Sequence, residues 1–315
     1  MNRWKRADMH LHTRFSGWRN LRLIEAQDSY LSPDRAFLMA KQRGMDFVCF
    51  TDHDTIDGAL DFLSRHPEQA SSVIIGEELE TCLPGTAQWF HLGIYEVDER
   101  IHEDLVRLKE DGRATMDYLR TRGLLFSLNH PFQSFRTIGA ARRFLDEILP
   151  LVPAVETCNS ASPPSHQPVL EAMLAGRAGG PIVGIGGSDA HTPQRVAAAF
   201  TAAPATTKEE FIDSIRQGRC CAGGQALGLG ALIGDVYRII GEYYASLVPT
   251  PRRQSALRTV HGLLGTLALT PAVLLGLPAI LASLHTARQE WIGRFGPWSE
   301  GALVRHARRL VARGR

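Results

Sequence analysis

Seven short apolar segments, each ending in polar or charged residues, limit what this chain can fold into more than any other feature. Helix-like stretches lie between several of them; residues 32–43, for example, begin with Ser-Pro-Asp, a helix cap followed by a first-turn proline and a first-turn acid. Strands that alternate with helices favour right-handed β-α-β units and a parallel sheet. Seven such units predict an α/β fold with a closed or nearly closed barrel, whose functional residues lie where the strands end. The segments are residues 7–12, 46–54, 72–80, 89–96, 124–131, 154–160 and 181–191.

Charge is distributed unevenly along the 315 residues. The formal net charge is +2, but residues 226–315 hold eleven arginines against four carboxylates, a net of +7, which leaves −5 on the first 225 residues. A net negative charge on the first 225 residues is unlike that of a protein that binds a nucleic-acid backbone. We therefore expect nucleic acid as a partner only in the form of a short oligonucleotide. The sequence indicates no protein partner.

The cysteines and the N-terminus indicate a reducing compartment. Five cysteines without a CxxC pair predict neither a disulfide framework nor a structural zinc knuckle. The first ten residues, MNRWKRADMH, lack the apolar stretch of a secretion signal. These observations predict a cytoplasmic catalytic domain. Cys158 has no identified base beside it, so we interpret it as a small buried thiol.

A change in composition near Gly223 predicts a domain boundary. The barrel pattern ends with a capped helix within residues 204–220, and residues 224–315 contain no lysine. We expect a catalytic domain at residues 1–223 and a helical, partly hydrophobic extension at residues 224–315.

Within the extension, residues 259–287 carry no formal charge and are long enough to cross a hydrocarbon core of about 30 Å. Pro271 and Pro278 make a buried helical hairpin an equal alternative. Flanking arginines, with Trp291 and Trp298, favour association of this segment with the inner face of the membrane.

Histidines and carboxylates gather at six of the seven predicted strands. A single strand-end histidine is more often a hydrogen-bonded structural residue than a ligand, but their joint placement favours a metal site. Imidazole and carboxylate together suit Zn²⁺, Mn²⁺ or Fe²⁺, and a shared carboxylate allows two ions. We expect His66, His102 and His166 at the surface. The candidate ligands are His10, His12, His53, Glu78, His91, His130, Asp189 and His191, and Asp8 alternates with the first two on the same face.

The motifs DMHLHT, FTDHDT, GEELET, a later histidine, NHP and GSDAH follow one another in this order over about residues 7–223. This series resembles the PHP family, named for polymerase and histidinol phosphatase. The resemblance implies a (β/α)7 PHP-type barrel, two or three bound divalent metal ions and a phosphoester substrate.

The resemblance also implies a role for each ligand. The first ion would be held by His10, His12, Glu78 and Asp189; Glu78 would bridge to a second ion held by His91 and His130. A third ion would be bound by His53 and His191. Gly17 stands where the family has Asp or His, so one ligand of the third site is missing and we expect this ion to bind weakly. Asp52 and Asp54 are the candidates to replace it.

The expected mechanism follows from the metals. A hydroxide bridging the ions would attack phosphorus while the ions and a cationic side chain neutralise the phosphoryl oxygens. Arg14, beside the HxH motif, is the favoured cationic clamp, with Arg136 and Arg195 behind it. His53 or His191 would protonate the leaving group if it does not bind metal.

We predict a phosphatase or phosphodiesterase that acts on a small phosphorylated molecule or a nucleotide. A nuclease of short oligonucleotides is the first alternative, and the acidic barrel counts against it. The second is a non-catalytic, metal-stabilised module with a membrane anchor, which the nearly complete ligand set disfavours. Since every predicted ligand precedes residue 224, a chain shortened there should keep its metal and its activity, provided that it folds.

Overall fold

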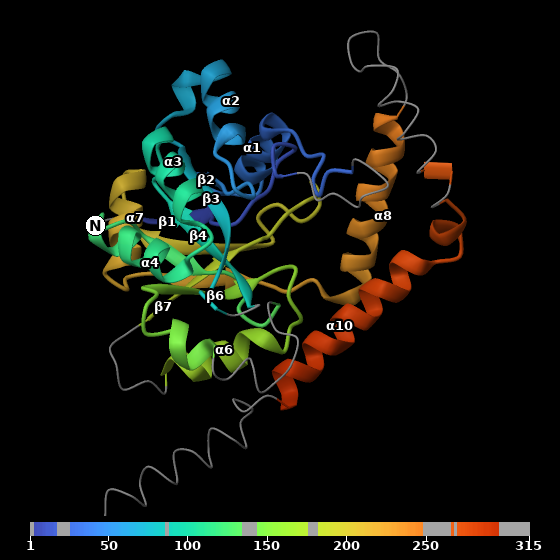
Figure 1. The fold of residues 1–315 in the computed structure, drawn as a ribbon. Coiled ribbons are helices and arrows are strands. Elements are labelled where there is room, and N and C mark those ends of the chain that lie inside the picture. The colour runs from blue at the N-terminus through green and yellow to red at the C-terminus, as the bar shows by residue number, and fades with distance from the viewer. Residues whose placement is uncertain are drawn as a thin grey trace, which may run out of the picture.

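The computed structural model describes residues 3–17, 26–85, 88–133, 144–175, 182–247, 266–267 and 270–295. Its centre is one curled sheet with helices on the outside, shown in Figure 1. The strand order is β7-β6-β5-β4-β3-β2-β1-β8-β9. The strands are β1 Trp4–Asp8, β2 Phe47–Phe50, β3 Val73–Cys82, β4 Trp89–Tyr95, β5 Phe126–Leu128, β6 Ala154–Asn159, β7 Val183–Gly187, β8 Ala199–Pro204 and β9 Cys221–Gly224.

The prediction of seven parallel strands was wrong in number and in direction. β1, β2 and β3 run parallel, as do β5, β6 and β7, but β4 is antiparallel to both of its neighbours. Only a short connection joins β3 to β4, too short for the crossover that a parallel pair needs. β8 and β9 add two antiparallel strands beside β1. Their sequences, AFTAAP and CAGG, lack a strong apolar pattern, so the sequence does not predict these two strands.

The barrel closes where β1 and β7 end. Leu11 and Ala190 form a parallel bridge, and the Asp189 amide donates to the His10 carbonyl at 2.7 Å. A side chain at Gly187 would place its Cβ 2.3 Å from the Cβ of His10, so only glycine allows the two strands to approach this closely. Closure therefore brings the first and last ligand motifs of the predicted series side by side.

Helices cover the outside of the sheet. The predicted helix start at residue 32 is confirmed: Ser32 accepts a hydrogen bond from the Arg35 amide and caps α1. Apolar side chains such as Phe62 of α2 and Phe211 of α7 are buried against the sheet. The helices are α1 Pro33–Gln42, α2 Asp57–Arg65, α3 Glu99–Leu108, α4 Gly112–Thr121, α6 His166–Ala175 and α7 Lys208–Arg216.

Two long helices follow the barrel: α8 Gly228–Ser246 and α10 Leu277–Phe295. α10 packs against α8 and α6, and both long helices lie along one side of the barrel in Figure 1. No helix within the described ranges is long and apolar enough to span a membrane. Residues 259–265, 268 and 269 lie outside the described residues, so the predicted membrane-associated segment is described only at residues 266–267 and 270–287.

Candidate metal centre

Four candidate ligand atoms converge in the first cluster, from the segments that follow β1 and β7 and from the middle of β3. His10 Nε2 lies 3.0 Å from His12 Nε2 and 3.2 Å from Glu78 Oε2. Asp189 Oδ1 lies 3.6 Å from His10 Nε2 and 3.4 Å from His12 Nε2. Tetrahedral ligands on bonds of about 2.0–2.1 Å stand about 3.3 Å apart. These spacings therefore fit one divalent ion.

The second cluster uses the other oxygen of the same glutamate. Glu78 Oε1 lies 2.9 Å from His130 Nε2 and 3.5 Å from His91 Nδ1, and the two imidazole nitrogens are 3.4 Å apart. Glu78 is fully buried, and its Oε2 has no hydrogen-bond partner within the described part of the chain. A buried carboxylate oxygen without a donor is costly unless a cation binds it. The two oxygens of Glu78 thus face two separate ligand sets.

Charges within the centre shift its pKa values strongly. Burial alone would raise the pKa of Glu78, but the imidazoles around it, His10 foremost, hold that pKa well below its usual range. Burial would likewise lower the pKa of His12, yet its pairing with Asp189 and Glu78 raises that pKa to about 9. In the metal-free protein, positively charged imidazolium groups therefore balance the negative charge of the buried carboxylates.

Metal-free protein should therefore lose stability as the pH rises. The folded-state pKa of His12, about 9, lies above its unfolded value of 6.5, so this pairing stabilises the fold fully below pH 6.5 and is lost as the pH rises through 9. The expected loss in unfolding free energy is on the order of 3 kcal/mol. Urea unfolding of chelator-treated protein at pH 6.5 and pH 9 measures it. His12→Asn should remove the part of this dependence that His12 contributes, and greater stability at pH 9 would contradict the prediction.

Three polar residues hold the ligands in place. Glu156 accepts from the His130 amide at 2.9 Å and lies 2.9 Å from His10 Nδ1, which directs His10 Nε2 into the first cluster. Asn129 Nδ2 donates to Glu78 Oε1 at 3.0 Å, and Asn159 Nδ2 donates to Asp189 Oδ2 at 3.2 Å. Neither asparagine had a predicted role. Their position at strand ends was the only signal that could have identified them.

Two carboxylates that were candidate metal ligands, Asp8 and Asp52, stabilise the fold instead. Asp8 accepts hydrogen bonds from the amides of Ser188 and Ala197, and Asp52 accepts from the Thr13 hydroxyl at 2.8 Å. Burial raises the pKa of each carboxyl to about 6. Both carboxylates therefore fix the backbone that carries the ligands and do not themselves join a cluster.

His53 and His191 lie together with His12 in a third group of ligand atoms. His53 also reaches Glu78, since its Nδ1 is 3.2 Å from Oε2, the oxygen that faces the first cluster. Burial and the neighbouring His12 lower the pKa of His191. Asp28, which no motif contains, reaches both imidazoles, with its Oδ2 3.7 Å from His53 Nε2 and 3.8 Å from His191 Nε2.

The three predicted arginine clamps have different outcomes. Arg14 is exposed, with its guanidinium 5.4 Å from the ring centre of Phe15, so its role in the site stays a prediction. Arg195 is 3% exposed and forms an ion pair with Asp235 of α8. It supports the fold and is not available as a clamp. Arg136 lies outside the described residues.

Other predictions are resolved by burial. His166 is buried, not at the surface, because its ring packs under α10 and its Nε2 donates to the Gln289 carbonyl at 2.9 Å. His102 is partly buried and pairs with Glu77. Burial raises the pKa of Cys158 to about 11, in agreement with its interpretation as an inert thiol.

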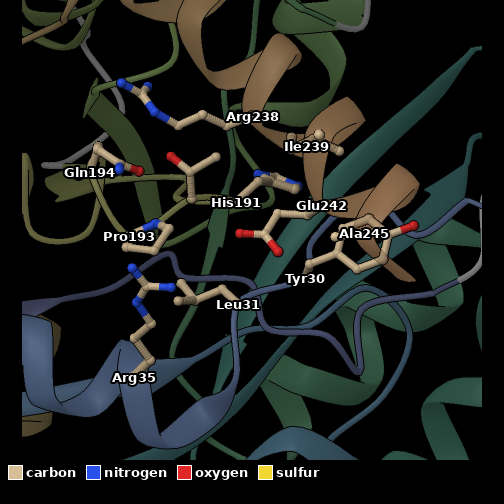
Figure 2. A pocket seen from close by; sticks show the side chains of 12 residues that line it. Tyr30, Leu31, Arg35, His191, Pro193, Gln194, Arg238, Ile239, Glu242 and Ala245 are labelled. Carbon is tan, nitrogen blue, oxygen red and sulfur yellow. The ribbon is translucent and has the colours of Figure 1, made fainter. Parts of the chain in front are cut away.

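A cavity of about 410 Å³ adjoins the metal centre at His191. Figure 2 shows Arg35 of α1 and Arg238 of α8 on opposite sides of it, with Glu242 and His191 between them in this view. Tyr30 and Ile239 add apolar surface. The first helix of the predicted extension therefore forms one wall of the cavity.

Comparisons with known proteins agree with this geometry. A model of the PHP domain matches residues 8–122, and a PHP-associated model matches residues 181–220. An uncharacterized protein of Methanocaldococcus jannaschii is 34% identical over 76 residues, 24% of this chain and 44% of that protein, so the match spans less than half of the relative. The crystal structure of PsfC from Pseudomonas syringae PB-5123 has a TM-score of 0.51 at 22% identity, covering 77% of this chain and 100% of PsfC. That likeness shows a shared fold.

The two matched segments contain every predicted ligand except His130. The clusters of histidine and carboxylate together with this match support a metal-dependent hydrolase. The chain therefore carries a PHP domain, matched over residues 8–122, and a PHP-associated segment at residues 181–220.

Proposed function

We propose that this chain hydrolyses a phosphoester of a small molecule or a nucleotide. The observation that carries the proposal is the placement of Glu78, which gives one carboxylate oxygen to each of two ligand clusters. A shared carboxylate holds two cations close enough to act on one phosphoryl group. When bound, the ions would supply an activated water as nucleophile and neutralise charge on the phosphoryl oxygens.

The protein's own groups prepare this chemistry. Glu156 and Asn129 fix the orientation of His10 and Glu78, and two ligands, His130 and Asp189, are held at the positive φ angles of 26° and 52°. Non-glycine residues adopt such angles where the surrounding structure enforces them, often at functional sites. His191 borders both the third group and the cavity, so it would lie near the leaving group of a substrate bound there. It would give that group a proton if it does not bind a cation.

The cavity favours a small substrate over an oligonucleotide. Its volume, about 410 Å³, lies in the range of small-molecule sites. Arg35 and Arg238 offer positive charge to an anionic substrate, while the net charge of −5 on the first 225 residues would repel a long phosphate backbone. Hydrolysis of short oligonucleotides is the second candidate, because a short strand could still reach the metal centre.

A substrate panel tests the proposal. Phosphomonoesters, cyclic and linear nucleotides and short RNAs would be incubated with the protein and Mn²⁺ or Zn²⁺, with phosphate or nucleotide release as the readout. We expect turnover of one or more small phosphoesters that chelation abolishes. Turnover of RNA alone would favour the nuclease, and metal-dependent hydrolysis of only non-phosphorus esters or amides would contradict the proposal.

Removing the cavity's positive charge should weaken substrate binding. We expect Arg35→Gln to raise KM for the best substrate about tenfold with a smaller effect on kcat, because one charge-assisted hydrogen bond contributes about 1.5 kcal/mol. Steady-state kinetics measure this, and Arg100→Gln, an exposed change on α3, is the matched control. An unchanged KM would exclude Arg35 from substrate binding.

A further inference from the structure

Asp28 enters the metal centre from the connection between β1 and α1, away from every ligand motif. Its side chain is only 13% exposed, and its Oδ2 lies 3.7 Å from His53 Nε2 and 3.8 Å from His191 Nε2. Its second oxygen, Oδ1, is buried and has no hydrogen-bond partner among the residues that the structure describes. Such a carboxylate is costly to bury without a cation.

The distances separate two explanations of this contact. A charge-assisted hydrogen bond between imidazole and carboxylate would bring the nitrogen to about 2.7–2.9 Å from the oxygen. Gaps of 3.7 and 3.8 Å are too long for that. They fit two ligand atoms bound to one cation, since two bonds of about 2.0–2.2 Å allow the ligand atoms to lie up to about 4.2 Å apart.

The tautomer of His191 agrees with a ligand role. Its Nδ1 lies 3.1 Å from the Asp189 carbonyl, an acceptor that requires the proton on Nδ1. The lone pair is then on Nε2, the atom that faces Asp28. A hydrogen bond of one ring nitrogen to a backbone carbonyl is the usual way in which proteins orient a metal-binding histidine.

Two serines hold the Asp28 segment against the other ligands. The Ser16 hydroxyl donates to Asp28 Oδ2 at 3.2 Å and accepts from the His53 amide at 3.1 Å. The Ser29 hydroxyl donates to the His191 carbonyl at 3.2 Å. Asp28 is thus tied to both imidazoles through short, local contacts.

We propose that Asp28 completes a third divalent-cation site with His53 and His191. The inference rests on the metal centre of the proposed function and changes one expectation drawn from the sequence, that Gly17 leaves this site a ligand short. Asp52 and Asp54 do not fill the gap: Asp52 is bound to Thr13, and Asp54 accepts from the Glu80 amide at 3.1 Å.

The chain also offers a rescue variant. Within the described residues, a Cβ at Gly17 would meet the His53 carbonyl oxygen at 3.6 Å, an ordinary contact. The first side-chain atom of an aspartate at position 17 therefore has room beside His53. If Asp28 is a ligand, a carboxylate introduced there can take its place.

The experiment counts the ions bound per chain, by elemental analysis after mild chelation and by Mn²⁺ titration. We expect three for the unmodified protein, two for Asp28→Asn with the third affinity at least about 100-fold weaker, and three again for Gly17→Asp/Asp28→Asn. Asp117→Asn, an exposed change on α4, should keep three. An Asp28→Asn protein with the same ion count and affinities as the unmodified chain would overturn the inference.

The number of ions bound by the unmodified chain distinguishes failure of the third site from failure of the proposed function. An unmodified chain that binds only two ions at saturating Mn²⁺ would reject the third site and leave the proposed function intact, whereas a chain that binds none would reject both. If Asp28→Asn does not fold, anomalous scattering from Mn²⁺-soaked crystals of the unmodified protein decides the question. A peak within bonding distance of Asp28 supports the inference, and peaks confined to the other two clusters overturn it.

Discussion

Glu78→Gln is expected to remove the ions of the two clusters that share this carboxylate and to lower kcat/KM by at least about 1,000-fold. Glutamine keeps the volume of the side chain but removes the charge that both clusters share. Loss of a residue that merely orients a ligand already reduces metal affinity or activity 10- to 100-fold, so the shared ligand should have a larger effect. Elemental analysis and kinetics on the best substrate measure the two losses.

Two controls make this result specific. Glu103→Gln, an exposed change on α3, should leave ion content and turnover unaltered. Glu78→Asp keeps the charge with a shorter reach and should retain part of the metal if the substitution itself does not disrupt folding. A Glu78→Gln protein that keeps all of its tightly bound ions and normal turnover would show that the carboxylate does not bridge the clusters.

The second large effect concerns α8. Asp235→Ala is expected to lower the unfolding free energy by about 3–5 kcal/mol, because it leaves the guanidinium of Arg195 buried without its partner. Asp235 accepts from Arg195 Nε at 2.6 Å and from the Thr192 hydroxyl at 2.7 Å, one residue from His191. Urea unfolding measures the loss. We also expect weaker metal binding, since the loop that carries Asp189 and His191 loses an anchor.

Arg238→Gln is the matched control for this variant. Arg238 pairs with the same carboxylate at 3.3 Å but is 47% exposed, so its removal should change stability by less than about 1 kcal/mol. Equal effects of the two variants would contradict the special role of the buried pair. The same contacts revise the expectation for a chain that ends near Gly224: it lacks Asp235, and we now expect it to be markedly less stable.

Most of the candidate ligands could be found in the sequence because they follow short apolar runs, although β3 and β4 extend past Glu78 and His91. His10 and His12 alternate along the chain, and Glu78, His130 and Asp189 each follow an apolar run. The strand count was not predictable, because β8 and β9 consist largely of alanine and glycine and are defined by the partners they pair with.

The roles of Asp28 and Asp235 could not be predicted from the sequence, for a different reason. Each is a single acidic residue in a stretch without a motif, one in a connection and one on a helix. The role of each residue depends on a contact with a group far along the chain: Asp235 contacts Arg195, and Asp28 lies near His191. Local pattern carries no information about such contacts.

The closure of the barrel at Leu11 and Ala190 has a consequence for the order of folding. His10 and Ser188, which are hydrogen-bonded at this seam, lie 178 positions apart in the chain. Contacts between such distant residues form late, because the entropy of closing a long loop opposes them until most of the chain is organised. His10 and Asp189 meet only after that step, so the first cluster does not exist in a half-folded barrel. A cation that requires both residues therefore binds only the closed barrel. Its binding slows the reopening of the barrel at this seam.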